Sequence, residues 1–236
     1  MKKFTLFISM AFVAMNISAE ELQIGSHDSS SKYAPIYGDQ ADRLFISQVI
    51  YTADELSEIA GHEITKLTFE LRTQASTCDW SEISVRAKEV DFTAFSGSEF
   101  ASIEGATAIF SGTVIGSAST TVEIELAQPF VYEGGNLLLD FRKTTPGGSY
   151  SRNWKGFYAT QVSDYRVISK YSSSSAMPEE GVRSLDRPDI TITYLAGEQA
   201  IELTEVNAGA VKRIENGQLI VIKNGVKYNA IGATIK

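Results

Sequence analysis

The chain contains little of what enzymes most often use for covalent and metal chemistry. Its 236 residues include one cysteine, Cys78, and only two histidines, His27 and His62. A single cysteine excludes an internal disulfide, so the fold has to be stabilised by burial of a hydrophobic core. Cys78 lies in the stretch Ser76 to Trp80 without a neighbouring base, which indicates an inert packed or loop thiol rather than a nucleophile.

Neither histidine stands in a complete catalytic or zinc-binding motif. His62-Glu63 begins like the zinc-protease motif, but Lys66 occupies the place of the second histidine. His27-Asp28 precedes Ser29 to Ser31, yet adjacent loop residues do not normally converge in triad geometry, and no Gly-x-Ser-x-Gly elbow is present. We therefore expect surface or capping roles for both histidines and name no catalytic residue.

Positive charge is also scarce. The chain has 21 Lys and Arg residues against 29 Asp and Glu residues. Two of the basic residues, Lys2 and Lys3, lie in a segment that we expect to be removed, which leaves 19 basic against 29 acidic residues and a net charge of −10. An anionic protein repels phosphate backbones, so the composition argues against a nucleic-acid partner.

Long apolar runs are absent except at the N-terminus. There, Lys2 and Lys3 precede the apolar run from Phe4 to Met15, and the small residues ending at Ala19 follow. This order predicts a secretory signal peptide cleaved near Ala19, and the run is shorter than the roughly 20 residues of a membrane-spanning helix. We expect a secreted protein, at the outer-membrane surface or extracellular, without a transmembrane segment in the mature chain.

Alternation of apolar and polar residues dominates the sequence from Leu44 to Leu195. Leu67, Phe69 and Leu71 alternate with polar residues, and the same pattern recurs in four further segments, separated by turn residues such as those at 133–136 and 146–148. It predicts an all-β fold, an antiparallel β-sandwich of jelly-roll type over residues 20–195. One short helix is expected after Thr52, with Glu55 completing a capping box and Gly61 ending the helix.

The C-terminal segment differs from the rest of the chain. Residues 196–209 read as a linker, and Asn216-Gly217 and Asn224-Gly225 predict a C-terminal β-hairpin tail over residues 210–236. From Thr204 onward the net charge is +3, whereas the body from Glu20 to Leu203 carries −13. So short a tail needs to dock onto something for stability, and the alternative is a hairpin added to the edge of the main sandwich.

Parts of the chain resemble known exported proteins. The stretches 24–26, 33–38 and 47–56, together with Pro129 to Leu137, resemble a β-sandwich module of secreted proteins from Gram-negative anaerobes, over roughly residues 22 to 195. Ile214 to Gly232 is similar to the C-terminal tails of exported proteins in the same bacteria, and distantly to type IX secretion sorting domains. The resemblance implies secretion machinery as a partner of the tail and routing to the cell surface.

The stretch from Ser149 to Tyr158 has the composition of a recognition loop. It interleaves aromatic rings with hydrogen-bonding and cationic groups between two predicted strands. Rings stack on the apolar faces of sugars or of peptide side chains, while Arg and Asn supply directional donors. The predicted ligand-binding residues are Tyr150, Arg152, Asn153, Trp154 and Tyr158, with Trp80 as a second platform.

These features favour a secreted or cell-surface binding module that is not an enzyme and recognises an extracellular glycan or protein, in the manner of an adhesin. Two alternatives stay open: a glycan-active hydrolase that uses a pair of carboxylates, and a structural subunit of a surface assembly. No cofactor is expected. Asp28, Asp39 and Asp42 offer oxygens for a structural calcium ion, although their spacing matches no calcium-loop motif.

Overall fold

The computed structural model describes residues 18–37, 43–72, 79–116, 119–146, 155–172, 176–196, 210–215, 218–223, 226–229 and 233–235. Over these residues the chain is all-β, as predicted, and no helix there is long and apolar enough to cross a membrane. The strands fall into two compact units, one within Ile17–Ala196 and one after Ala196. The elements of the larger unit are β1 Ser18–Ile24, β2 Ser29–Ser31, β3 Leu44–Tyr51, η1 Ser57–Ile59, β4 Glu63–Glu70, β5 Asp79–Val90, β6 Thr107–Ile115, β7 Thr121–Val131, β8 Asn136–Lys143, β9 Phe157–Gln161, β10 Val167–Ser172, β11 Val182–Ser184, β12 Asp186–Pro188 and β13 Ile190–Ala196.

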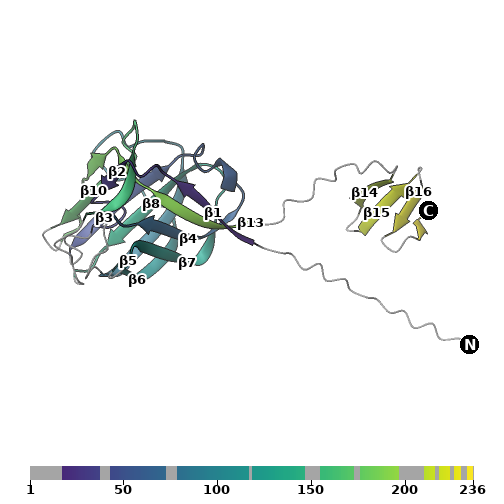
Figure 1. Ribbon diagram of the computed structural model, residues 1–236, viewed down its shortest axis with the longest axis horizontal. Helices are drawn as coiled ribbons and strands as arrows, with labels where there is room; N and C mark the ends of the chain where they lie inside the picture. Colours follow the sequence, from purple (N-terminus) through teal and green to yellow (C-terminus); the bar gives the residue numbers. More distant parts are fainter. Residues whose placement is uncertain are drawn as a thin grey trace, which may run out of the picture. The chain divides into compact units, whose positions relative to one another are not determined.

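The larger unit has a sandwich-like arrangement of two main sheets (Figure 1). One is four-stranded in the order β1-β13-β4-β7, and the other is six-stranded in the order β11-β10-β3-β8-β5-β6. A small third sheet, β12-β9-β2, adjoins them, and every pairing is antiparallel. Among the pairings, β5 binds β6, β4 binds β7 and β3 binds β8, so each pair encloses the previous one in sequence.

The alternating residues of the sequence form one core between the two main sheets. The four-stranded sheet contributes Leu67 and Phe69 of β4, and the six-stranded sheet contributes Val85 of β5 and Phe141 of β8. Strand β3 is buried at all eight positions, so it is covered on both faces. Alternate residues of β3 therefore point away from the main core, toward a loop described below.

The predicted helix after Thr52 is wrong in type and length, because only the single 3-10 turn Ser57–Ile59 forms. The capping contact is present: the Glu55 carboxylate accepts hydrogen bonds from the Thr52 backbone N–H at 2.9 Å and from its hydroxyl at 3.0 Å. Gly61, with φ of +81°, ends the turn as expected. Ion pairs from distant strands hold Glu55 in place, so the segment is fixed by tertiary contacts after one turn.

The smaller unit is a four-stranded antiparallel sheet in the order β14-β15-β16-β17, where the sequence predicted a β-hairpin tail. Its strands are Ala210–Glu215, Gln218–Lys223, Val226–Asn229 and Thr234–Ile235. Both Asn-Gly turns, and residues 197–209 of the predicted linker, lie outside the described residues.

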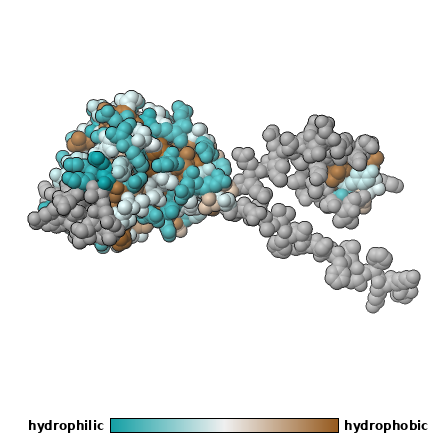
Figure 2. Space-filling model, in the orientation of Figure 1, coloured by the Kyte–Doolittle hydropathy of each residue, from teal (hydrophilic) through white to brown (hydrophobic). Residues whose placement is uncertain are grey.

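The surface of the larger unit is mostly hydrophilic on the face that Figure 2 shows, with apolar residues scattered among polar ones. Six large apolar side chains in the described part of the chain are exposed: Tyr33, Ile115, Val131, Tyr165, Val182 and Val226. Single exposed apolar residues are ordinary, so the informative ones are those that line a hollow.

Candidate functional site

Four of the six predicted ligand-binding residues, Tyr150, Arg152, Asn153 and Trp154, lie outside the described residues, as do Asp39 and Asp42. The structure places the other two, Trp80 and Tyr158, in separate surroundings. Neither of these two residues lines either of the two aromatic hollows described below.

Trp80 lies in the core, which corrects its prediction as a ligand platform. Its side chain is 0% exposed, and its indole N–H donates to the Tyr37 carbonyl at 2.9 Å. The cause is a β-bulge in β5: the register with β6 shifts between Trp80 and Ile83, and Glu82 has a φ of +56°. Two residues then oppose one, which turns Trp80 to the same face as Ile83.

Tyr158 is half-buried on β9, and its ring stacks on the His27 imidazole with centroids 4.5 Å apart. His27 in turn lies close to two carboxylates, with Nε2 3.5 Å from Glu70 and 3.6 Å from Asp189. Asp189 is buried and already accepts hydrogen bonds on both oxygens, from the His27 backbone N–H at 2.8 Å and from the Thr160 hydroxyl at 2.7 Å.

This His27 cluster surrounds a hollow of only about 70 Å³. Gly25 has a φ of +130°, and a Cβ there would lie 1.9 Å from an Asp189 oxygen, so the turn before His27 is packed directly onto the carboxylate. A site this small, with the Asp189 oxygens engaged by the fold, does not hold a pyranose ring between its carboxylates. The arrangement positions the β1–β2 turn.

Asp28, the described member of the predicted calcium set, also serves the fold. Its carboxylate accepts from the Gln161 backbone N–H at 2.9 Å and from the Ser26 hydroxyl at 2.7 Å. These hydrogen bonds, the backbone one first, hold the pKa of Asp28 below its ordinary value. Within the described ranges, no three His, Cys, Asp or Glu side chains gather as a metal site.

The hollow with the chemistry of a recognition site lies at the β10–β11 edge of the six-stranded sheet. We call it the tyrosine cleft; its volume is about 480 Å³. The lining residues come from β2 and the turn after it and from the β10–β12 region: Ser30, Ser31, Lys32, Tyr33, Val167, Ser169, Lys170, Tyr171, Val182, Arg183, Ser184 and Asp186.

Strand register explains one wall of the cleft. Val167 pairs with Ser184, and Ser169 with Val182, so these residues share the face of β10 and β11 that is continuous with the core. The core therefore opens at this edge into a hollow with mixed apolar and hydroxyl lining. Val182, at 64% exposure, is the most exposed of the large apolar residues in the described chain.

Three tyrosines form a stacked group at the cleft. The Tyr37 and Tyr171 rings stack with centroids 4.6 Å apart, and the Tyr33 ring lies 5.1 Å from Tyr37 and 6.4 Å from Tyr171. Tyr37 is buried, whereas Tyr33 is 50% exposed. Tyr33 is thus a half-exposed ring at the cleft that packs against two other rings, and an exposed aromatic ring is a group on which a ligand can stack.

Several polar side chains of the cleft already form hydrogen bonds within the chain. Asp186 accepts from the Ser29 hydroxyl and from the Ser184 hydroxyl, the latter at 3.4 Å. The Arg183 guanidinium lies 4.4 Å from the Tyr165 ring centroid and donates to the Phe95 and Ser96 carbonyls, so its charge is held on the other face of β11. Lys32 and Lys170 are exposed at the cleft.

The predicted recognition loop rejoins the described chain beside this cleft. Gly156, with φ of +87°, packs so closely that a Cβ would lie 2.2 Å from the Ser31 carbonyl oxygen and 3.1 Å from the Lys32 Cα. The Gly156 carbonyl accepts from the Arg72 backbone N–H at 3.0 Å, which fixes the junction. Lys155, which directly follows Trp154 in the sequence, is therefore next to the turn that carries Tyr33.

Little in the sequence pointed to the cleft. Tyr33 and Tyr37 belong to a stretch noted above for its resemblance to a structural module, and Tyr171 precedes a serine-rich loop; nothing in their spacing joins them. No protein-family model matches the chain, and neither a curated protein nor a solved structure does.

Proposed function

We propose that this chain is a non-enzymatic binding module that recognises a glycan at the tyrosine cleft. The observation that carries the proposal is the half-exposed Tyr33 ring, backed by Tyr37 and Tyr171, at a hollow of about 480 Å³. That volume is in the range of ligand pockets and accommodates one or two sugar rings. Lining hydroxyls and two lysines provide hydrogen-bonding groups for a polyhydroxylated ligand.

The predicted aromatic loop extends the same proposal. Its C-terminal junction at Lys155 and Gly156 lies against Ser31 and Lys32. Tyr150, Arg152, Asn153 and Trp154 precede that junction in the sequence, and we propose that they bind the same ligand. Both Asp189 oxygens accept hydrogen bonds within the chain, which supports a binding role rather than hydrolysis by a carboxylate pair.

A glycan array with the purified mature chain tests the proposal. Tyr33→Ala removes the platform and is expected to lower binding at least tenfold, because stacking and burial at one ring are worth about 1.5–3 kcal/mol. Tyr33→Phe keeps the ring and should retain most binding. Ile115→Ala, at an exposed apolar position outside the cleft lining, is the matched control. Equal binding by Tyr33→Ala and Ile115→Ala would show that the cleft is not the binding site. Binding to proteins but to no glycan would show that the ligand is a protein.

We also infer that the larger unit is wound as a jelly roll. The nesting of β5 with β6, β4 with β7 and β3 with β8 supports this inference, because a long antiparallel ribbon rolled into two sheets has this order.

We propose further that the chain is exported and that its C-terminal unit acts as a sorting segment at the cell surface. Cleavage near Ala19 leaves the β1 residues from Glu20 to Ile24, which pair with β13, in the mature chain. N-terminal sequencing of the secreted product tests the cleavage. Fractionation of cells that make the chain with and without residues 204–236 tests the tail, since equal surface delivery would exclude a sorting role.

A further inference from the structure

The loop that joins β5 to β6 covers the face of the six-stranded sheet opposite to the main core. Beneath it, Ile50 of β3, Leu138 of β8 and Ile168 of β10 form a second buried cluster with Phe95 of the loop. Phe92 and Phe100 are partly buried against this cluster. This is why β3 is buried on both faces: its outward residues are covered by the loop.

Several distant residues hold the loop in place. The Gln48 side chain donates to the Ala101 carbonyl at 2.9 Å and accepts from the Ala101 backbone N–H at 2.8 Å. The Phe95 backbone N–H donates to the Tyr165 carbonyl at 2.8 Å. Arg183 donates to the Phe95 and Ser96 carbonyls at 3.1 and 2.9 Å. A loop that is held at several points is preorganised, so ordering it on binding costs little free energy.

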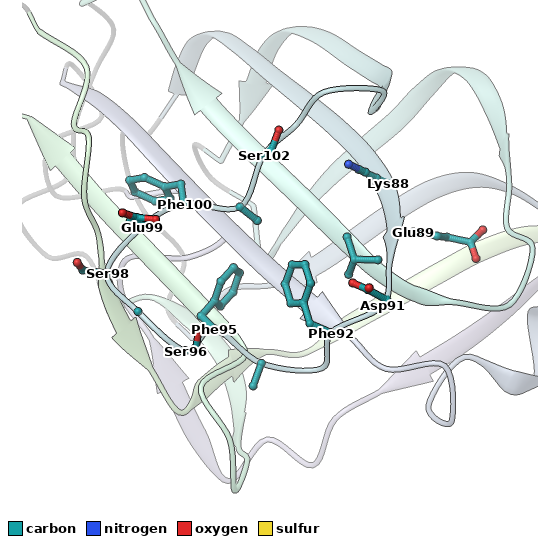
Figure 3. A pocket seen from close by; sticks show the side chains of 14 residues that line it. Lys88, Glu89, Asp91, Phe92, Phe95, Ser96, Ser98, Glu99, Phe100 and Ser102 are labelled. Atoms are coloured by element: carbon teal, nitrogen blue, oxygen red, sulfur yellow. The ribbon is translucent and has the colours of Figure 1, made fainter.

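This anchored loop borders a hollow of about 1010 Å³, which we call the phenylalanine hollow (Figure 3). Its lining is formed by residues 88–92 and 94–102. Phe92 and Phe95 stand edge to face with centroids 6.1 Å apart, and the Phe100 ring lies on the other limb of the loop. Phe92 and Phe100 are partly buried, so their rings provide apolar and π surface for a ligand at this hollow.

Charge on this loop has one sign. From Glu89 to Glu104 the sequence contains four acidic residues and no Lys or Arg. Asp91 and Glu99 are exposed and lie on opposite sides of the Phe92 and Phe95 rings in Figure 3. Glu99 also faces Glu180 through an antiparallel backbone bridge, which brings a further carboxylate to this end.

The remaining charged groups at the hollow are engaged elsewhere. Glu89 accepts from the backbone N–H groups of Glu133 and Gly135. Lys88 donates to the Glu104 carbonyl at 2.9 Å, and Arg183 is held on the Tyr165 ring and two loop carbonyls. Asp91 and Glu99, with Glu180 next to Glu99, are therefore the exposed carboxylates that these contacts leave to a ligand, and Lys88 is the one cation among the residues that line the hollow.

We propose that the phenylalanine hollow is a second binding site, for an extended basic peptide segment of a partner protein. Arginine or lysine side chains of the peptide pair with Asp91 and Glu99 and lie over the phenylalanine rings, while apolar residues between them contact Phe92 and Phe100. Aromatic faces attract cations, and carboxylates at both ends orient a peptide with spaced cations. The site is separate from the tyrosine cleft and does not depend on the glycan proposal.

Fluorescence polarisation with a labelled octapeptide that alternates arginine and leucine tests this site, with an octapeptide of alternating glutamate and leucine as the comparison probe. The intact chain should bind the first peptide and not the second. The double variant Asp91→Asn/Glu99→Gln should weaken binding about tenfold or more, since two charge-assisted contacts are lost. Phe92→Leu should weaken it by a smaller factor, because an apolar contact remains.

The matched control is Glu123→Gln/Glu125→Gln, which removes the same charge from exposed positions on β7. It should change the affinity less than twofold. Equal weakening by the two double variants would show unspecific attraction to an acidic protein and overturn the proposal. Absence of binding by the intact chain, or full binding by Asp91→Asn/Glu99→Gln, would overturn it as well. Unchanged thermal unfolding of each variant establishes that the fold is intact.

Discussion

Glu55 joins the turn after β3 to two arginines, Arg166 and Arg187, that come much later in the chain, and its removal should lower the stability. One carboxylate oxygen accepts from Arg166 Nη1 and Arg187 Nη1, each at 2.9 Å, and the other accepts from Thr52. The Arg187 side chain is 2% exposed and lies 5.1 Å from the Tyr51 ring centroid. The Nε atoms of both arginines are buried without a hydrogen-bond partner. Glu55→Ala would therefore leave cationic groups buried without their carboxylate.

Breaking a buried ion pair by removing one partner costs about 3–5 kcal/mol. Glu55 keeps 26% of its side chain exposed, and solvent screens part of the interaction, so the lower end of about 3 kcal/mol applies. For a unit of this size, about 2–4 °C of melting temperature is lost per kcal/mol, which gives a decrease of about 6–12 °C.

Differential scanning calorimetry of a chain that begins at Glu20 checks this value. Glu58→Ala is the matched control in the same turn, because Glu58 is exposed and its nearest contact, the Tyr194 hydroxyl, is 3.5 Å away. Its effect should stay within about 0.5 kcal/mol. Adding Arg187→Met to Glu55→Ala should recover part of the loss, since the more deeply buried of the two uncompensated charges is then gone. Equal melting temperatures for Glu55→Ala and Glu58→Ala would refute the ion-pair reasoning.

Three further predictions follow from buried groups and close packing. Burial raises the pKa of Tyr132 to about 12, and the nearby Glu89 carboxylate adds to the effect. The pKa in the folded chain therefore exceeds the value of about 10 in the unfolded chain. The contribution of Tyr132 to the free energy of unfolding is complete below pH 10 and is lost as the pH rises through 12. Urea unfolding at pH 9 and 11.5 should show this loss, and Tyr132→Phe should show a smaller one; identical pH dependence in both chains would contradict it. Gly156→Ala should destabilise the larger unit by at least about 2 kcal/mol, since the φ of Gly156 is +87° and a Cβ would lie 2.2 Å from the Ser31 oxygen. Urea unfolding of this variant is compared with that of Gly105→Ala, where a Cβ meets nothing within 4 Å. The difference between the two variants separates the steric clash from backbone strain. In Trp154→Phe, the remaining Trp80 should emit at short wavelength and resist acrylamide quenching, because it is fully buried; a solvent-exposed spectrum would contradict its place in the core.

Local patterns in the sequence predicted the fold class but not the site. Alternation is a local property: Leu67 and Phe69 lie on one face of β4 because successive side chains point to opposite sides of a strand. The prediction for Trp80 was wrong because the bulge at Glu82 changes the sheet face of the β5 residues before it. A bulge cannot be predicted reliably from residue types.

The tyrosine cleft could not be predicted because its walls are joined only by strand register. Tyr33 and Tyr171 are separated by most of the larger unit, and they meet because β10 pairs with β3 and because β9 brings Gly156 against Ser31. The phenylalanine hollow is partly local, since its three rings lie in one loop. Its depth, however, depends on Ile50, Leu138 and Ile168, which come from three other strands.

The nested strand pairs also set the order in which the larger unit can assemble. Of the three nested pairs, β5 and β6 close the shortest loop, because 16 residues separate them. The pairings of β4 with β7 and of β3 with β8 each close a longer loop. The pairing of β1 with β13 spans the whole unit, from Ser18 to Ala196. A chain leaving the ribosome thus cannot complete the four-stranded sheet until β13 has emerged, and pairings this distant in sequence make folding slow.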